Sequence, residues 1–203
     1  LAMAAGLVGF QNANPYMTDF PNDDYEALWS TVDSLEQEGL PRSAQEKVML
    51  IYEKASEDQN TPQIVKALIY RAKYSTQLEE DGLAQSIQDL ETELAASEFP
   101  VKPLLHSLLG ELYHHYLDQN RWELEDRTST GAEPGPDLQT WSIDQLLARA
   151  FMHYEQSVAF PDLETIPISK IQAITQGGKE TANLRPTLFD FLAHRAIDFM
   201  TND

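Results

Sequence analysis

The chain has 203 residues, which suits one domain of ordinary size or a helical array with a core of its own. Its 33 acidic residues against 14 basic ones give a net charge of −19. Such a surface repels phosphate backbones and anionic lipid heads, so we expect neither nucleic acid nor an acidic membrane as a partner. The lack of cysteine excludes disulfides, thiolate catalysis and cysteine-ligated zinc, and no stretch has the roughly 20 apolar residues of a transmembrane segment.

Residues 1–22 differ from the rest of the chain. They begin with small apolar side chains, and Ala2-Met3-Ala4 matches the A-x-A pattern of a signal-cleavage region. A signal remnant would imply export, whereas the alternative is a disordered end or a remnant of cloning. We therefore expect 1–22 to be disordered or signal-derived, followed by a single all-α domain over 23–203.

Helical periodicity is the main signal from residue 23 onward. The first predicted helix has Asp23 as its N-cap, and the second opens with Ser43 and Glu46 in the S-x-x-E pattern of a capping box. The third starts at Thr61-Pro62, because proline is tolerated in the first turn of a helix. The predicted apolar faces of the first four helices comprise Tyr25, Leu28, Trp29, Val32 and Leu35; Val48, Ile51, Tyr52 and Ala55; Ile64, Val65, Leu68, Ile69 and Ala72; and Leu83, Ile87, Leu90 and Leu94.

The fifth predicted helix has the widest apolar face, which indicates burial on more than one side. The pattern stops after Trp122, and the segment 128–140 is a predicted loop because it is rich in glycine and proline. The apolar rows of this helix are Leu104, Leu105, Leu108, Leu109, Leu112, Tyr113, Tyr116 and Leu117.

Two further helices are expected in the remainder. Ser142 and Gln145 form a second capping box, and an amphipathic helix follows it. A shorter piece covers 168–174, and the last helix opens after Pro186 and is apolar on most sides, which predicts docking onto the rest. The apolar positions after the capping box are Ile143, Leu146, Leu147, Ala150, Phe151, Tyr154 and Val158.

No stretch alternates between apolar and polar residues as a strand does, so the predicted fold class is all-α. Helices joined by short turns predict an array of antiparallel helical hairpins. Pairs begin near residues 24, 61 and 101, a spacing of about 37–40, whereas tetratricopeptide (TPR) repeats recur at about 34. The array is therefore TPR-like and irregular.

The histidines of the fifth helix are the first candidates for chemistry. His114 points away from the apolar face, whereas His115 and His106 fall on its two edges, since each residue turns the helix by about 100°. Two histidines of one helix that chelate a metal need i, i+3 or i, i+4 spacing, which His114 and His115 lack. His153 and His194 are expected to be isolated on other helices. The pattern favours scaffold histidines and predicts no catalytic, cofactor or metal site.

The end of the same helix concentrates charge. We expect a solvated or ion-paired helix end there, since no nucleophile or apolar pocket accompanies the carboxylates. Trp122 is expected to anchor the chain as it leaves the helix rather than to bind a ligand. The stretch QGGKET at 176–181 is not a phosphate loop, because Glu180 replaces the required Ser or Thr and no strand precedes it. The charged residues are Arg121, Glu123, Glu125, Asp126 and Arg127.

Extended phrases of the chain resemble the N-terminal helical region of large bacterial alpha-2-macroglobulin-like proteins of the Gram-negative, Bacteroidetes type. The resemblance runs over roughly 23–203 and contains no catalytic motif. The phrases are LPRSAQEKVMLIYEKA (40–55), TPQIVKALIYRAKY (61–74), LEEDGLAQSIQDLE (78–91), FPVKPLLHSLLGELYHHYLDQNRWELEDRT (99–128) and RPTLFDFLAHRAIDFM (185–200).

The resemblance implies an exported protein on the periplasmic side of the envelope, whose parent traps proteases or surveys proteins. Trapping in that family uses a bait region and, in many members, a cysteine thioester. This chain has no cysteine and no β-rich domain, so no trapping residue can be assigned to it. The chain would be an N-terminal module that docks or scaffolds, with the following macroglobulin domains or an envelope complex as its protein partner.

Three functional hypotheses follow. The first is a non-enzymatic helical interaction module at the N-terminus of an alpha-2-macroglobulin-like envelope protein, without a cofactor. The second is a stand-alone helical adaptor subunit of a cell-envelope complex. The third is an enzyme or metal protein centred on His106, His114 and His115, which the helix geometry disfavours.

Overall fold

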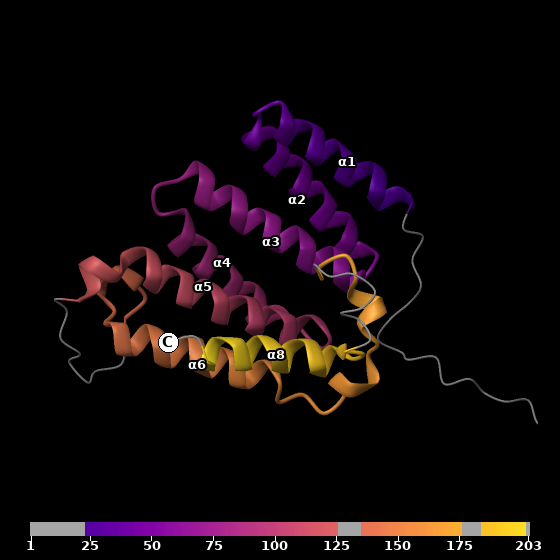
Figure 1. Ribbon diagram of the computed structural model, residues 1–203. Coiled ribbons are helices and arrows are strands. Elements are labelled where there is room, and N and C mark those ends of the chain that lie inside the picture. The colour runs from indigo at the N-terminus through magenta and orange to yellow at the C-terminus, as the bar shows by residue number, and fades with distance from the viewer. Residues whose placement is uncertain (1–22, 126–134, 176–183, 202–203) are drawn as a thin grey trace, which may run out of the picture.

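The structure is a computed structural model that describes residues 23–125, 135–175 and 184–201 (Figure 1). The expected signal-derived or disordered segment 1–22 lies outside the described residues, as do the first part of the predicted loop and the stretch 176–181. Within the described residues the chain forms helices and short turns, with no strand. The predicted all-α class is therefore confirmed.

Consecutive helices pack as antiparallel hairpins, and the pairs start at Asp23, Thr61 and Val101, as the spacing predicted. Figure 1 shows the hairpins stacked in chain order, with the last helix lying against α5 and α6. The helices are α1 (Asp23–Gln37), α2 (Pro41–Glu57), α3 (Thr61–Leu78), α4 (Gly82–Ala96), α5 (Val101–Leu124), α6 (Ile143–Ser157) and α8 (Leu188–Thr201). Short 3-10 helices are η1 (Leu138–Thr140), η2 (Leu163–Thr165) and η3 (Ile168–Ile171).

The helix starts show which capping predictions were right. Ser142 and Gln145 form the complete capping box of α6, as predicted. The Ser43–Glu46 box is wrong, because α2 already begins at Pro41 and Ser43 lies inside its first turn, where it cannot cap. Proline favours the first turn of a helix, and this preference set the start of α2.

Two caps have no counterpart among the predictions. The Asn60 side chain accepts a hydrogen bond from the backbone N–H of Gln63 at the start of α3. Before α8, the Thr187 hydroxyl accepts from the N–H of Asp190, and the Asp190 carboxylate accepts from the N–H of Thr187. The latter is a reciprocal cap of the same kind as the box at α6.

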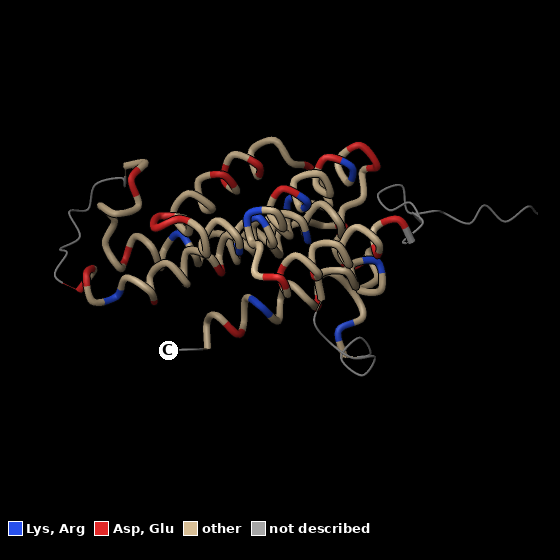
Figure 2. The backbone as a smooth tube through the Cα atoms, turned by 90° about the horizontal axis from the view of Figure 1, so that it is seen from above, with Lys and Arg blue, Asp and Glu red and all other residues tan. Residues whose placement is uncertain are grey.

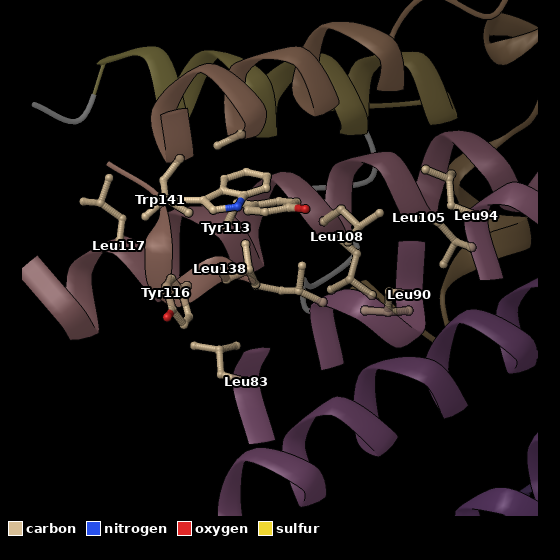
Figure 3. Packing of buried hydrophobic residues seen from close by; sticks show 14 of the residues in the cluster. Leu83, Leu90, Leu94, Leu105, Leu108, Tyr113, Tyr116, Leu117, Leu138 and Trp141 are labelled. Atoms are coloured by element: carbon tan, nitrogen blue, oxygen red, sulfur yellow. The ribbon is translucent and has the colours of Figure 1, made fainter. Parts of the chain in front are cut away.

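The hydrophobic core falls into three adjoining clusters. The largest joins α4, α5 and α6, where Leu105 and Leu108 of α5 lie near Leu90 of α4 and the Tyr113 ring stacks on Trp141 (Figure 3). A second cluster joins α1, α2 and α3. The third joins α3 and α5 to η2, η3 and α8, which confirms that the last helix docks onto the array. Helix α5 is thus buried on several sides, as its wide apolar face predicted.

The approach of α5 to α6 depends on one glycine. A Cβ atom added at Gly110 would lie 2.8 Å from two ring carbons of Tyr154 on α6. That is closer than real Cβ contacts come, so any side chain at position 110 would push the two helices apart or displace the ring. The aromatic ring of Tyr154 therefore lies directly on the α5 backbone.

Candidate functional site

Two buried histidines meet between α5 and α6. The Nδ1 atoms of His106 and His153 lie 3.0 Å apart, although 47 positions separate the residues in sequence. Only 9% of His106 and 1% of His153 is exposed. The prediction that His153 is isolated is therefore wrong, because helix pairing brings it to the edge of the α5 face that carries His106.

A carboxylate on α4 completes this buried network. Nε2 of His153 lies 3.1 Å from a carboxylate oxygen of Glu91, and the Tyr113 hydroxyl donates to the same oxygen over 2.9 Å. The guanidinium of Arg149 lies 3.6 Å from it. The Tyr113 ring also stacks on the His153 ring, with 5.5 Å between the centroids. Three consecutive helices, α4, α5 and α6, are thereby joined by polar contacts that run from the buried histidines to the half-buried Glu91 and Arg149.

Burial sets the electrostatics of the network. It lowers the pKa of His106 from its ordinary 6.5 to about 4, and the proximity of His153 and Lys102 acts in the same direction. Burial alone would raise the pKa of Glu91, but hydrogen bonds from His153 and Tyr113 outweigh it, and the net pKa is lowered. The network is therefore arranged around a neutral His106 and an ionised Glu91.

The hydrogen-bond pattern fixes consistent tautomers. With both rings neutral, Nε2 of His153 donates to the Glu91 carboxylate, its Nδ1 accepts, and Nδ1 of His106 carries the donated proton. All buried side-chain nitrogen and oxygen atoms in the described part of the chain have a hydrogen-bond partner. The described residues also contain no cluster of three or more potential metal ligands. The network thus links the packed helices α4, α5 and α6.

The neighbouring histidines of α5 are placed the opposite way from the prediction. His114 is half-buried, because Phe199 of the docked helix α8 lies edge-on to it with ring centroids 5.1 Å apart. His115 is exposed, and its Nε2 contacts the side-chain amide of Gln119 at 2.8 Å. The helical wheel of α5 alone predicted the reverse, since it contained no information on where α8 docks.

The charged end of α5 is solvated. Trp122 is 85% exposed, so the prediction that it anchors the chain is wrong: it points away from the α5 faces that the other helices cover. Arg121 pairs with Asp118 over 3.6 Å, and Glu123 and Glu125 are exposed. Asp126 and Arg127 lie outside the described residues. Within the described residues, the end of α5 is therefore solvated and ion-paired, as predicted.

A groove on another face is the best candidate for binding. Helices α2 and α4 both pack on α3, and they leave between them a cavity of about 520 Å³ over α3. Met49 lines it from α2, Arg71 from α3, Glu79 from the turn that follows α3, and Asp89 and Glu93 from α4. We call this cavity the α2–α4 groove. No sequence pattern pointed to it, because its walls come from three helices whose relative placement is a tertiary property.

Comparisons with known proteins give no further assignment. Neither the family models, nor the curated proteins, nor the solved structures contain a match to this chain. Among the described helices, none combines the length and the hydropathy needed to cross a bilayer.

Proposed function

We propose that the chain is a non-enzymatic helical interaction and scaffold module that binds a protein partner. The α2–α4 groove carries this proposal, because it is an accessible concave surface of about 520 Å³ with both apolar and charged walls. His106, whose pKa burial lowers to about 4, lies elsewhere, and its ring contacts His153 in the core. An enzyme would place such a group in the cleft that receives its substrate.

We further propose that the module belongs to the N-terminal part of an exported alpha-2-macroglobulin-like envelope protein, whose parent traps proteases or surveys proteins in the periplasm. The resemblance of the quoted phrases supports this origin. Those phrases fall on α2, α3, α4, α5 and α8, so they include Met49, Arg71 and Asp89 of the groove walls. The alternative is a stand-alone helical adaptor subunit of an envelope complex.

The gene separates these two origins. Macroglobulin-type β-sandwich sequences after codon 203 support the parent protein, whereas a stop codon there supports the adaptor. Fractionation of the natural host then tests export. Recovery of the protein with periplasmic or envelope markers is the expected result, and recovery with cytoplasmic markers contradicts both origins.

In-cell cross-linking tests the interaction itself. A photoreactive side chain at Met49 faces the groove, and one at Leu50 on the same helix is the control, because Leu50 is exposed but does not line the groove. We expect a discrete protein adduct from position 49 and none from position 50. Equal adducts from both positions, or none from either, would contradict binding in the groove.

A further inference from the structure

We propose that the α2–α4 groove takes a basic protein segment, in which an apolar side chain is flanked by lysines or arginines. This inference rests on the proposed interaction function and specifies the chemistry of the partner. Three features support a basic occupant: the shape of the groove, its charge and the placement of Met49.

The groove lies between α2 and α4, which flank α3 on two sides. Helices α2 and α4 both contact α3, and the Tyr52 hydroxyl of α2 donates to the Glu93 carboxylate of α4 over 2.6 Å. This hydrogen bond links the walls and fixes their separation. Because the α2–α4 groove is already formed in the free protein, binding requires little reorganisation of the helices, and a protein segment can bind without remodelling the array.

Charge selects a basic occupant. Three carboxylates line the groove, on Glu79, Asp89 and Glu93, and its single cation, Arg71, is paired with Asp89 over 3.4 Å. The walls therefore carry an excess of negative charge, and the array around them does too, since acidic positions outnumber basic ones over the described helices (Figure 2). Such a field attracts lysine and arginine and repels acidic segments.

Met49 supplies the apolar contact. It is 36% exposed on the α2 wall, and the exposed acids Glu46 and Glu53 lie one turn before and one turn after it on the same helix face. Methionine adapts its flexible side chain to varied apolar partners, which suits a docking surface. An apolar residue set against Met49, with basic residues on either side, matches both features at once.

A pair of synthetic peptides tests the proposal on the purified full chain. The first is a helical peptide of leucine, lysine and alanine, with leucine at every third or fourth position, and the second replaces every lysine with glutamate. The methionine methyl resonances report where the peptide binds, and fluorescence anisotropy reports its affinity. We expect the basic peptide to shift the Met49 methyl signal and to leave that of Met152 on α6 unchanged, and the acidic peptide to shift neither.

Matched variants separate the groove from general attraction to an acidic protein. Glu79→Gln with Glu93→Gln removes two charges from the groove, and Glu155→Gln with Glu164→Gln removes two exposed charges elsewhere. We expect the first pair to weaken binding about tenfold and the second less than about twofold. Likewise, Met49→Ser should weaken binding more than Leu50→Ser. Equal weakening by the groove and control variants, a shift at Met152 in place of Met49, or equal affinity for the acidic peptide would overturn the proposal.

Failure of this inference is distinguishable from failure of the proposed function. If a photoreactive side chain at Met49 captures a protein in cells while the basic peptide shows no preference for the groove, the basic chemistry is wrong and the interaction function stands. If neither the cellular partner nor the peptide contacts Met49, both are wrong.

Discussion

Nδ1 of His106 on α5 lies 3.0 Å from Nδ1 of His153 on α6, inside the core and away from the groove. One ring must donate and the other accept, so the contact requires that the two rings are not both protonated. Glu91 and Tyr113 continue the network toward α4. The pair therefore makes the packing of three helices sensitive to protonation.

The free energy of unfolding should fall as the pH is lowered, over a pH range set by the pKa of His106. Its pKa is about 4 in the folded chain against an ordinary 6.5, so between these values the unfolded chain binds a proton that the folded chain does not. Stability contributed by the neutral ring is thus complete above pH 6.5 and is lost as the pH falls toward 4. We expect a loss of about 2–3 kcal/mol in the free energy of unfolding between pH 7 and pH 4.5, measured by urea denaturation.

His106→Asn is the control for that window, because asparagine can still donate to His153 but does not titrate. Glu91 also has a lowered pKa, and its contribution is lost only as the pH falls below the ordinary carboxylate value of 4.5. The variant should therefore have a flatter stability profile than the natural chain between pH 6.5 and 4.5. Parallel profiles would show that His106 is not the responsible group.

Gly110→Ala should destabilise the α5–α6 packing by about 1–3 kcal/mol, because the added methyl group overlaps the Tyr154 ring. Gly135→Ala provides the control, since a Cβ there meets no atom within 4 Å. Thermal denaturation of both variants checks this. A Gly110→Ala protein as stable as the natural chain would mean that the helices lie further apart than described.

Leu109→Ala should cost about 2–5 kcal/mol, since Leu109 is fully buried in the largest core cluster and its truncation leaves a cavity. His115→Ala should change the free energy of unfolding by less than about 0.5 kcal/mol, because that side chain is exposed. Urea denaturation of the two variants compares the faces of α5 directly. Similar losses of stability in the two variants would show that the buried face of α5 has been assigned wrongly.

Glu91→Ala should cost about 1–3 kcal/mol, because it leaves the Tyr113 hydroxyl and the His153 ring without their shared acceptor. Glu91→Gln retains an acceptor oxygen and should cost less. The order of the two variants in chemical denaturation is the test. An alanine variant no less stable than the glutamine variant would show that this carboxylate does not hold the network.

The fold could be predicted because the signals that define it are local. Apolar spacing set the helices, and Thr61 and Ser142 marked helix starts through the first-turn preference of proline and a capping box. Ser43 gave the same local signal and was wrong, since Pro41 began α2 earlier. Local chemistry thus predicted the elements well, and failed where two signals competed within one turn.

The sites depended on tertiary placement, which no local pattern contains. His153 meets His106 only because α6 packs on α5, and His114 is half-buried only because α8 brings Phe199 to it. The α2–α4 groove likewise depends on how two helices flank a third. These relations join residues far apart in sequence, so the helical wheel of one segment could not predict them.

We propose that the protein binds its partner through the α2–α4 groove and not through the buried histidines. The most direct test is co-purification of the protein partner from the natural host with Met49→Arg and His106→Asn variants, after circular dichroism has shown that both fold. The account predicts that Met49→Arg loses the partner, because it places bulk and positive charge in the groove, whereas His106→Asn keeps it. Retention by Met49→Arg together with loss by His106→Asn would contradict the account.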